Sequence, residues 1–229
     1  MAFDGPATDL VLGANPTIEE WMDVAEPGLK KATMGMFRAV KEIAYKIRTA
    51  SCDKVQCFGT TASGDQIAID ILANNIIFSN LRQTGVVAVA SSKETPTEDP
   101  MGGKGYAVAF DPLDGASVID TNFAVGTIWG IYQGEKLTGI KGSQVKSAGI
   151  AMYGPRTTIT LAIDNMPGSH EFLLIDDYSA MHGQWVKSNE FTTINEGKLL
   201  APGNLRASQD NKGYADLFNY WMTHMYQLR

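Results

Sequence analysis

Only two cysteines occur among the 229 residues, too few to hold a chain of this length together by disulfide bonds. A reducing compartment is therefore the expected location of the protein. The sequence also lacks any run of 18 consecutive apolar residues, so we predict no transmembrane helix and no membrane partner. The 19 Lys and Arg residues are outnumbered by 25 Asp and Glu, and the net charge of −6 argues against a nucleic-acid-binding protein with a basic face.

The N-terminal segment, residues 1–16, shows neither a basic start followed by an apolar stretch nor an Arg- and Ser-rich amphipathic pattern. We therefore predict neither a secretory signal nor an obvious transit peptide. A cytoplasmic protein is expected, and the plastid stroma is the alternative if a transit peptide has been removed.

The first third of the sequence is predicted to be helical. Residues 17–20 have the Thr-x-x-Glu spacing of a capping box at the start of one helix. A second helix is predicted over about 29–48. A third is predicted to begin near residue 65 and to reach residue 81, with an apolar face that includes Leu72 and Asn75.

From residue 86 onward, short runs of β-branched and apolar residues alternate with turn residues. The later runs follow one another at hairpin-like spacing, which favours a mixed, largely antiparallel sheet over regular βαβ winding. A final helix is predicted over 212–228. The expected strands are 86–90, 106–110, 124–132, 149–153, 157–163 and 171–175.

These elements predict a layered α/β fold (α+β), in which N-terminal helices pack on the sheet and a further helix follows it. We expect one domain over residues 1–229. Its helical and sheet region would cover about 1–190, and residues 191–229 would begin a C-terminal α/β region. We expect that region to be incomplete, because the chain stops within or just after its last helix.

The sharpest chemical feature is the segment Asp111-Pro-Leu-Asp-Gly-Ala-Ser117, which follows a predicted strand. A tight turn would let the Asp111 and Asp114 carboxylates face one point, and together with the Leu113 carbonyl they suit Mg²⁺. The backbone N–H groups of residues 115–117 and the Ser117 hydroxyl could then hold a phosphate. Pro-Leu-Asp-Gly is also typical of a simple type I turn, and the local sequence leaves both interpretations open.

Three further carboxylates could reach the same point. Asp65 is well placed as the N-cap of the third helix, which is its more ordinary role. Asp70 lies in an Ile-rich stretch, where a carboxylate is costly unless it has a partner or a metal ion. Glu94 follows the strand that precedes the aspartate segment, although a charge on a surface loop is the more common role for such a residue.

The aspartate segment continues as Val-Ile-Asp-Thr-Asn-Phe-Ala-Val-Gly-Thr-Ile-Trp-Gly-Ile-Tyr132. Other distinctive stretches are Ile47-Arg-Thr-Ala-Ser-Cys52, Tyr153-Gly-Pro-Arg-Thr-Thr158, His170-Glu-Phe-Leu-Leu174, Glu196-Gly-Lys-Leu199 and Pro202-Gly-Asn-Leu-Arg-Ala207. Together they resemble the sugar-bisphosphatase family, whose metal motif is Asp-Pro-Leu-Asp-Gly-Ser-Ser. Within that family the sequence is more similar to the sedoheptulose-1,7-bisphosphatases than to the fructose-1,6-bisphosphatases, over nearly the whole chain.

The resemblance implies Mg²⁺-dependent hydrolysis of the 1-phosphate of sedoheptulose 1,7-bisphosphate, by a phosphoric monoester hydrolase that forms a homodimer or homotetramer. The same reaction on fructose 1,6-bisphosphate is a close alternative, and inositol-monophosphatase-type chemistry is a more distant one. A catalytically silent relative that binds sugar phosphates is the alternative from a different class.

The resemblance also implies a role for each matching residue. Asp70 and Glu94 match the catalytic pair that orients and deprotonates the attacking water. The positions that match metal ligands are Asp65, Glu94, Asp111, Leu113 through its carbonyl, and Asp114. The positions that match substrate-binding residues are Asp114, Gly115, Ala116, Ser117, Gly203, Asn204, Arg206 and Arg229.

Three features depart from the family pattern. Lys93 stands where the family has a metal-binding glutamate, and an ammonium repels Mg²⁺ at close range. Either Lys93 turns toward solvent and Glu94 takes the role, or one metal position is lost. Ala116 replaces a serine of the phosphate loop, and the chain ends at Arg229, before the family's C-terminal part.

Cys52 and Cys57 have the Cys-x₄-Cys spacing of the plant enzyme's thioredoxin-regulated pair, with different residues between them. Redox control, with thioredoxin as a partner, is therefore one hypothesis for this loop. The other is a pair of ordinary thiols in a reducing compartment.

Overall fold

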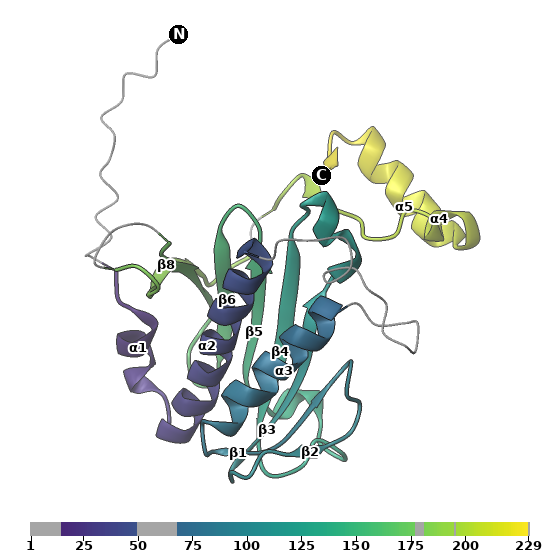
Figure 1. The fold of residues 1–229 in the computed structure, drawn as a ribbon. Coiled ribbons are helices and arrows are strands. Elements are labelled where there is room, and N and C mark those ends of the chain that lie inside the picture. Colours follow the sequence, from purple (N-terminus) through teal and green to yellow (C-terminus); the bar gives the residue numbers. More distant parts are fainter. Residues whose placement is uncertain (1–14, 50–67, 177–180, 195, 229) are drawn as a thin grey trace, which may run out of the picture. The chain divides into compact units, whose positions relative to one another are not determined.

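The computed structural model describes residues 15–49, 68–176, 181–194 and 196–228. The chain divides into two compact units, residues 1–192 and 193–229, and each is described by itself. The first unit contains an eight-stranded sheet and the N-terminal helices (Figure 1), and the second contains two helices and a two-stranded sheet. No helix among the described residues is both long and apolar enough to cross a membrane.

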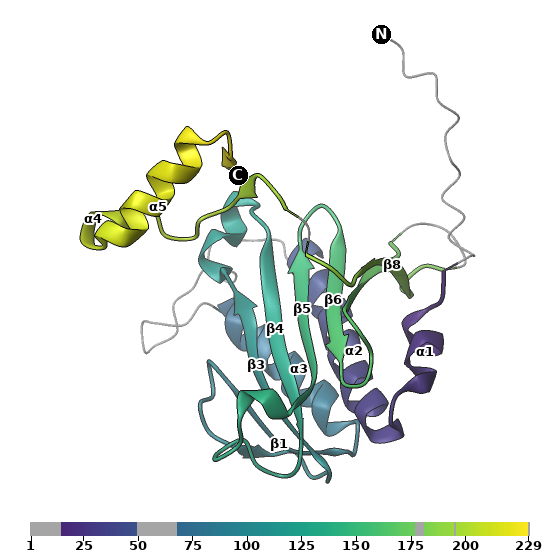
Figure 2. The same ribbon diagram turned by 180° about the vertical axis from the view of Figure 1, so that it is seen from behind.

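The strand order of the large sheet is β2-β1-β3-β4-β5-β6-β7-β8 (Figure 2). β1 and β3 run parallel, and each other neighbouring pair is antiparallel. This arrangement confirms the predicted mixed, largely antiparallel sheet of an α/β fold. The strands are β1 (Val87–Ser92), β2 (Asp99–Pro100), β3 (Tyr106–Asp114), β4 (Val125–Gln133), β5 (Val145–Tyr153), β6 (Thr157–Ile163), β7 (Ser169–Leu174) and β8 (Trp185–Phe191).

β8 is the one long strand of this sheet that the sequence analysis did not predict. Only its first two residues, Trp185 and Val186, are buried, and most of the strand beyond them is exposed. An edge strand of this kind carries no regular alternation of apolar and polar residues, so its sequence resembles that of a polar loop.

The helices of the first unit begin with α1 (Ile18–Trp21), which runs into a 3₁₀ turn, η1 (Met22–Val24). The predicted capping box at Thr17 is confirmed: the Thr17 amide donates to Glu20 Oε2 at 2.8 Å, and the Glu20 amide donates to Thr17 Oγ1 at 3.3 Å. α2 (Pro27–Thr49) packs on β4 and β5, and α3 (Ala68–Arg82) packs on β1 and β3.

Aromatic side chains fill the space between the helices and the sheet. Phe37 of α2 meets Phe172 of β7 and Trp185 of β8 edge-on, with ring centroids 5.6 and 5.3 Å apart. Phe78 of α3 meets Phe110 of β3 in the same way at 5.2 Å. Such pairs contribute beyond the burial of their area, so this face of the sheet carries the main apolar core.

The predicted apolar face of α3 is wrong at two positions. Leu72 is 40% exposed and Asn75 is also exposed, whereas Asn74 is buried. Ile76, Phe78 and Leu81 of the predicted face are buried as expected, so the error is local: packing against the sheet selects Asn74 in place of its neighbour Asn75.

The second unit contains β9 (Leu199–Leu200), α4 (Ala207–Asp210), α5 (Lys212–Thr223) and β10 (Gln227–Leu228). The predicted helix over 212–228 is confirmed from Lys212 to Thr223, but its predicted C-terminal end is wrong. α5 ends at Thr223, the His224 amide donates back to the Tyr220 carbonyl at 3.1 Å, and Met225 adopts a positive φ of 63°. That left-handed residue reverses the chain, so Gln227 and Leu228 pair with β9 as a parallel strand.

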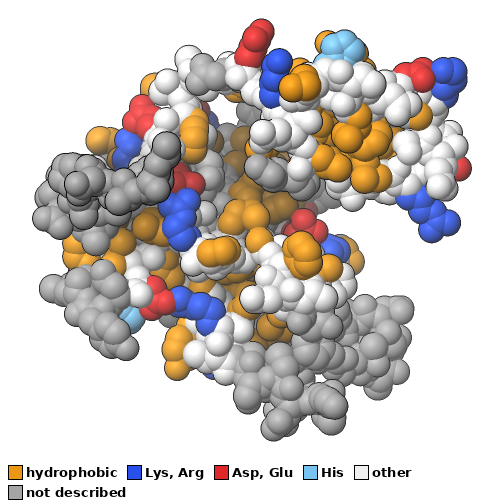
Figure 3. Space-filling view, turned by 90° about the horizontal axis from the view of Figure 1, so that it is seen from above, with side chains coloured by type: hydrophobic (Ala, Val, Ile, Leu, Met, Phe, Trp, Pro, Cys, Tyr) orange, Lys and Arg blue, Asp and Glu red, His pale blue; other side chains and the backbone are white. Residues whose placement is uncertain are grey.

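No residue of α5 is buried. Leu217, Tyr220 and Met222 are 43%, 51% and 49% exposed, and the space-filling view shows apolar side chains on this part of the surface (Figure 3). The amphipathic pattern that predicted this helix is therefore present without the burial that usually accompanies it.

Candidate functional site

The aspartate segment forms the end of β3 and not a β-turn, so the type I turn interpretation is wrong. The strand continues to Asp114, and its register with β4 shifts between Asp111 and Asp114. Pro112 lies within this irregular stretch, where a residue without an N–H group is tolerated. The Leu113 amide donates to Asp111 Oδ1 at 3.3 Å, which holds the Asp111 carboxylate against its own backbone.

Gly115 makes the turn that follows β3. Its φ of 84° lies in the left-handed region, and an added Cβ would stand 3.4 Å from Val125 Cγ1. A glycine is therefore the favoured residue at this position. The 3₁₀ turn η2 (Ala116–Thr121) starts directly after it, with Ala116 buried and Ser117 exposed. The predicted phosphate-loop residues thus stand beside Asp114 at the end of β3.

A buried hydroxyl pair anchors this end of β3 to its neighbours. Thr127 of β4 donates to the Pro112 carbonyl at 2.8 Å and shares a 2.7 Å hydrogen bond with the Tyr153 hydroxyl of β5. Burial raises the pKa of Tyr153 far above its usual range, so this hydroxyl keeps its proton. Neither residue was predicted from the sequence as a support of the motif.

Lys93 forms an ion pair with the aspartate segment. Its Nζ lies 3.5 Å from Asp111 Oδ2, and the two side chains are 58% and 24% exposed. Burial alone would lower the pKa of Lys93, but the charges of Asp111, Glu94 and Asp114 raise it overall. Lys93 therefore lies beside Asp111, although more than half of its side chain is exposed to solvent.

Asp70 lies in the first turn of α3, near the same carboxylates. Burial and the negative charge of Glu94 raise the pKa of Asp70 to about 6. Asp111 adds to this shift, and the Lys93 ammonium opposes it. The structure thus brings together five residues, which we call the Lys93 cluster: Asp70, Lys93, Glu94, Asp111 and Asp114.

A buried hydrogen-bond network holds the loop that carries Lys93 and Glu94. Ser92 donates to Asn74 Oδ1 at 2.7 Å, and Asn74 Nδ2 donates to the Thr95 hydroxyl at 3.2 Å. The Thr95 amide donates to Ser92 Oγ at 2.9 Å, which closes the loop on itself. This network was not predicted from the sequence, although the position of Asn74 one helical turn after Asp70 was a usable signal.

The chemistry of the Lys93 cluster suits a divalent cation, because carboxylate oxygens are the ligands that Mg²⁺ prefers and the charges of four carboxylates interact with one another and with Lys93 here. The described groups that would hold it are the carboxylates of Asp111, Asp114 and Glu94 and the Leu113 carbonyl. Within the described part of the chain, however, no three His, Cys, Asp or Glu side chains form a ready metal cage. The donors fit a metal ion in kind and charge, but they do not form a finished coordination shell.

Seven other predicted site residues belong to the second unit or lie outside the described residues. Gly203, Asn204 and Arg206 belong to the second unit, where all three are exposed just before α4. Four further predicted residues, Cys52, Cys57, Asp65 and Arg229, lie outside the described residues.

Comparison with known proteins decides the family. The chain matches the family model described as fructose-1-6-bisphosphatase, N-terminal domain, over residues 7–190. The chain belongs to the fructose-1,6-bisphosphatase family. The matched residues include the whole Lys93 cluster and nearly all of the eight-stranded sheet.

Among curated relatives, the chloroplastic sedoheptulose-1,7-bisphosphatase of Spinacia oleracea is 46% identical to this family member over 93% of the present chain. The Chlamydomonas reinhardtii protein of the same name is also 46% identical, over 89% of the present chain. These matches cover 55% and 51% of the two relatives, so the chain spans about half their length. A class 1 fructose-1,6-bisphosphatase of Methanocorpusculum labreanum is 31% identical over 88% of the chain.

Solved structures show the same fold. A fructose-1,6-bisphosphatase of Leishmania major in holo form aligns with a TM-score of 0.77 at 25% identity, over 94% of this chain and 72% of that one. A putative sedoheptulose-1,7-bisphosphatase of Toxoplasma gondii aligns with a TM-score of 0.78 at 25% identity, over 93% and 71%. These likenesses confirm the predicted fold class.

Proposed function

We propose that this chain is a Mg²⁺-dependent phosphoric monoester hydrolase that removes the 1-phosphate of sedoheptulose 1,7-bisphosphate. The observation that carries the proposal is the gathering of Asp70, Glu94 and Asp111 at one end of the sheet, beside the turn at Gly115. The 46% identity to proteins named sedoheptulose-1,7-bisphosphatase supports the choice of substrate.

Asp70 and Glu94 are proposed to orient and deprotonate the water that attacks the phosphorus. With a pKa near 6, Asp70 is ionised at neutral pH and still basic enough to accept a proton. A bound Mg²⁺ would neutralise phosphoryl oxygens and lower the pKa of the water. Asp111, Asp114 and the Leu113 carbonyl are proposed to hold that ion, with Asp65 and Glu94 as further ligands.

The residues after β3 are proposed to bind the phosphate that is cleaved. Gly115 is the N-cap of η2, and Ala116 and Ser117 begin the turn, whose first N–H groups have no partner within it. Asp114 precedes them and would face both the ion and the leaving oxygen. Arg206 and Arg229, with Gly203 and Asn204, are proposed to contact the rest of the sugar phosphate.

The test is phosphate release by this chain from sedoheptulose 1,7-bisphosphate and, in parallel, from fructose 1,6-bisphosphate, with Mg²⁺ and a dithiol reductant. We expect release from the first substrate that stops on chelation and in Asp114→Asn. Faster release from fructose 1,6-bisphosphate would favour the second candidate, which the name of the matching family supports. No release by the folded chain would contradict the proposal and favour a catalytically silent sugar-phosphate-binding protein.

We also propose an assembly, a form of redox control and a location, each implied by the resemblance to the family. We propose a homodimer or homotetramer, with thioredoxin as a partner if Cys52 and Cys57 form a regulated pair. The chloroplastic relatives favour the plastid stroma over the cytoplasm. Equal activity in reduced and oxidised samples would reject redox control.

A further inference from the structure

We infer that Lys93 acts as a built-in cation of the proposed active site, occupying a position beside Asp111 that a divalent metal ion would otherwise take. The inference rests on the proposed function, because it concerns the metal ions of that same site. It predicts that this chain binds fewer divalent ions, or binds them more weakly, than its carboxylates alone would allow.

The geometry leaves little room for a second cation at the same oxygen. Lys93 Nζ lies 3.5 Å from Asp111 Oδ2. A Mg²⁺ ion on that oxygen would sit about 2.1 Å from it, and so within about 6 Å of the ammonium. That separation is shorter than the Debye length of about 8 Å at physiological ionic strength, so the two positive charges repel each other.

Hydrogen bonds hold the Lys93 backbone beside the end of β3. Its amide donates to the Phe110 carbonyl of β3 at 3.1 Å. Its neighbour Ser92 is 5% exposed and is tied to Asn74 of α3. Lys93 therefore leaves the sheet at a defined point, between the end of β1 and the carboxylates at the end of β3.

The charges around Lys93 separate this arrangement from an ordinary surface ion pair. Asp111 is the ion-pair partner of Lys93 at 3.5 Å, and the negative charges of Glu94 and Asp114 also raise the pKa of Lys93. Asp70 feels the Lys93 charge in turn. One ammonium thus interacts electrostatically with several carboxylates at once, as a bound cation would. An exposed ion pair such as Lys212 with Asp216, in contrast, joins only two side chains of one helix.

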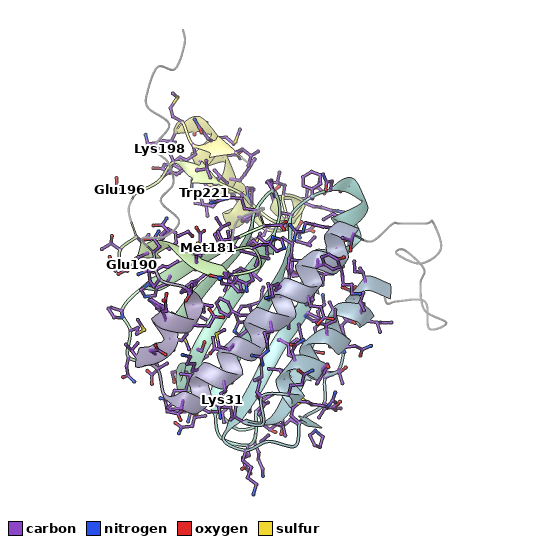
Figure 4. The ribbon with its side chains drawn as sticks, turned by 60° about the vertical axis from the view of Figure 1, so that its left-hand side comes forward. Lys31, Met181, Glu190, Glu196, Lys198 and Trp221 are labelled. Atoms are coloured by element: carbon purple, nitrogen blue, oxygen red, sulfur yellow. The ribbon has the colours of Figure 1, made fainter. Side chains whose placement is uncertain are left out.

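The experiment is calorimetric titration of the whole chain with Mn²⁺ as a spectroscopically convenient probe for Mg²⁺, checked by the electron paramagnetic resonance of free Mn²⁺. The variants are Lys93→Gln, which removes the charge, Lys93→Glu, which adds an oxygen ligand, and Lys93→Arg, which keeps the charge. Lys31→Gln is the matched control. Lys31 is exposed near the start of α2 (Figure 4). Its replacement by Gln changes the net charge by the same amount as Lys93→Gln, but away from the cluster.

We expect Lys93→Gln to tighten Mn²⁺ binding by about tenfold. Lys93→Glu is expected to bind one more ion per chain than the wild type, while Lys93→Arg and Lys31→Gln bind as the wild type does. The inference is overturned if Lys93→Gln and Lys93→Glu match the wild type in both the number of ions and their affinity.

Phosphate release measured on the same samples separates this inference from the proposed function. Hydrolysis by the wild type, combined with unchanged Mn²⁺ binding in the Lys93 variants, would reject the inference and leave the function intact. An additional ion in Lys93→Glu without hydrolysis in any sample would support the inference and reject the function. If no variant binds Mn²⁺, both fail.

Discussion

The two faces of the large sheet differ in what lies against them. On one face α2 and α3 bury side chains such as Ile131 of β4, which is fully inaccessible. On the other face Ile128 of the same strand is 41% exposed, and Ile150 of β5 opposite it is 46% exposed. Within the described residues of the first unit, no helix covers this second face (Figure 2).

The predicted chemistry lies where the packing is sparse. Asp111 pairs with Ile128 across β3 and β4, so its side chain emerges on the open face. There Asp111 and Lys93 line a hollow of about 560 Å³ together with Ile128 and Tyr132. Carboxylates that must accept and release ions cannot be sealed in an apolar core, because an unpaired buried charge is too costly. The covered face therefore supplies stability, the open face supplies Asp111 and Lys93, and α3 adds Asp70 from the covered side.

The largest expected effect is on activity at the open face. Asp111→Asn keeps the size of the side chain but removes the charge, so we expect kcat/KM to fall at least about 100-fold. Thermal unfolding should change little, because Asp111 is not part of the core. Asp99→Asn on β2 is the control and should keep full activity. A large fall in the unfolding temperature of Asp111→Asn would contradict the proposed difference between the two faces.

The next effect compares two isoleucines three residues apart on β4. Ile131→Ala should lower the free energy of unfolding by about 2–5 kcal/mol, because it leaves a cavity in the covered core. Ile128→Ala should cost less than about 1 kcal/mol, because the side chain is already 41% exposed. Urea denaturation of both variants measures the difference, and equal losses would show that the open face is packed after all.

A smaller effect is expected where the two regions meet, at the Asn74 network. Asn74→Ala would leave the buried Ser92 hydroxyl without its acceptor, at a cost of about 1–3 kcal/mol in unfolding free energy. Activity should also fall, because the loop that carries Lys93 and Glu94 loses its anchor. Asn75→Ala, next to it on the exposed side of α3, is the matched control and should change neither quantity.

The smallest effect on stability is the pH dependence that Asp70 contributes. The pKa of Asp70 is about 6 in the folded chain and lower in the unfolded chain. Between about pH 4 and 6 the folded state therefore keeps a proton that the unfolded state has lost. Its contribution to stability therefore falls as pH rises through this window. Asp70→Asn should be more stable than the wild type at pH 7, by on the order of 1 kcal/mol after solvent screening.

The same residue predicts the acid limb of the activity profile. The wild-type kcat/KM should fall as pH drops through about 6, because the Asp70 carboxylate becomes protonated. Asp70→Asn should lose most of the activity and also this limb. A wild-type profile that stays flat from pH 7 to pH 5 would show that Asp70 does not accept the proton.

Much of the local structure could be predicted because it depends on residues close together in the chain. The capping box at Thr17 and the bounds of β6 are confirmed, since both follow from a pattern within a few residues. The phase of α3 was predicted wrongly at Leu72, because the sheet selects the buried side. The end of α5 was also predicted wrongly, since Leu228 fits the helical period but pairs with β9.

The sequence by itself determined which reactive groups are present and in what order. The aspartate motif identified the family, and the Ile-rich surroundings of Asp70 marked that carboxylate as costly. Only the tertiary structure decided that Lys93 turns to Asp111 and that Asn74 supports its loop. It also decided that burial and nearby carboxylates raise the pKa of Asp70. These contacts join α3, β1 and β3, and a contact between distant segments depends on how those elements pack, which no local pattern encodes.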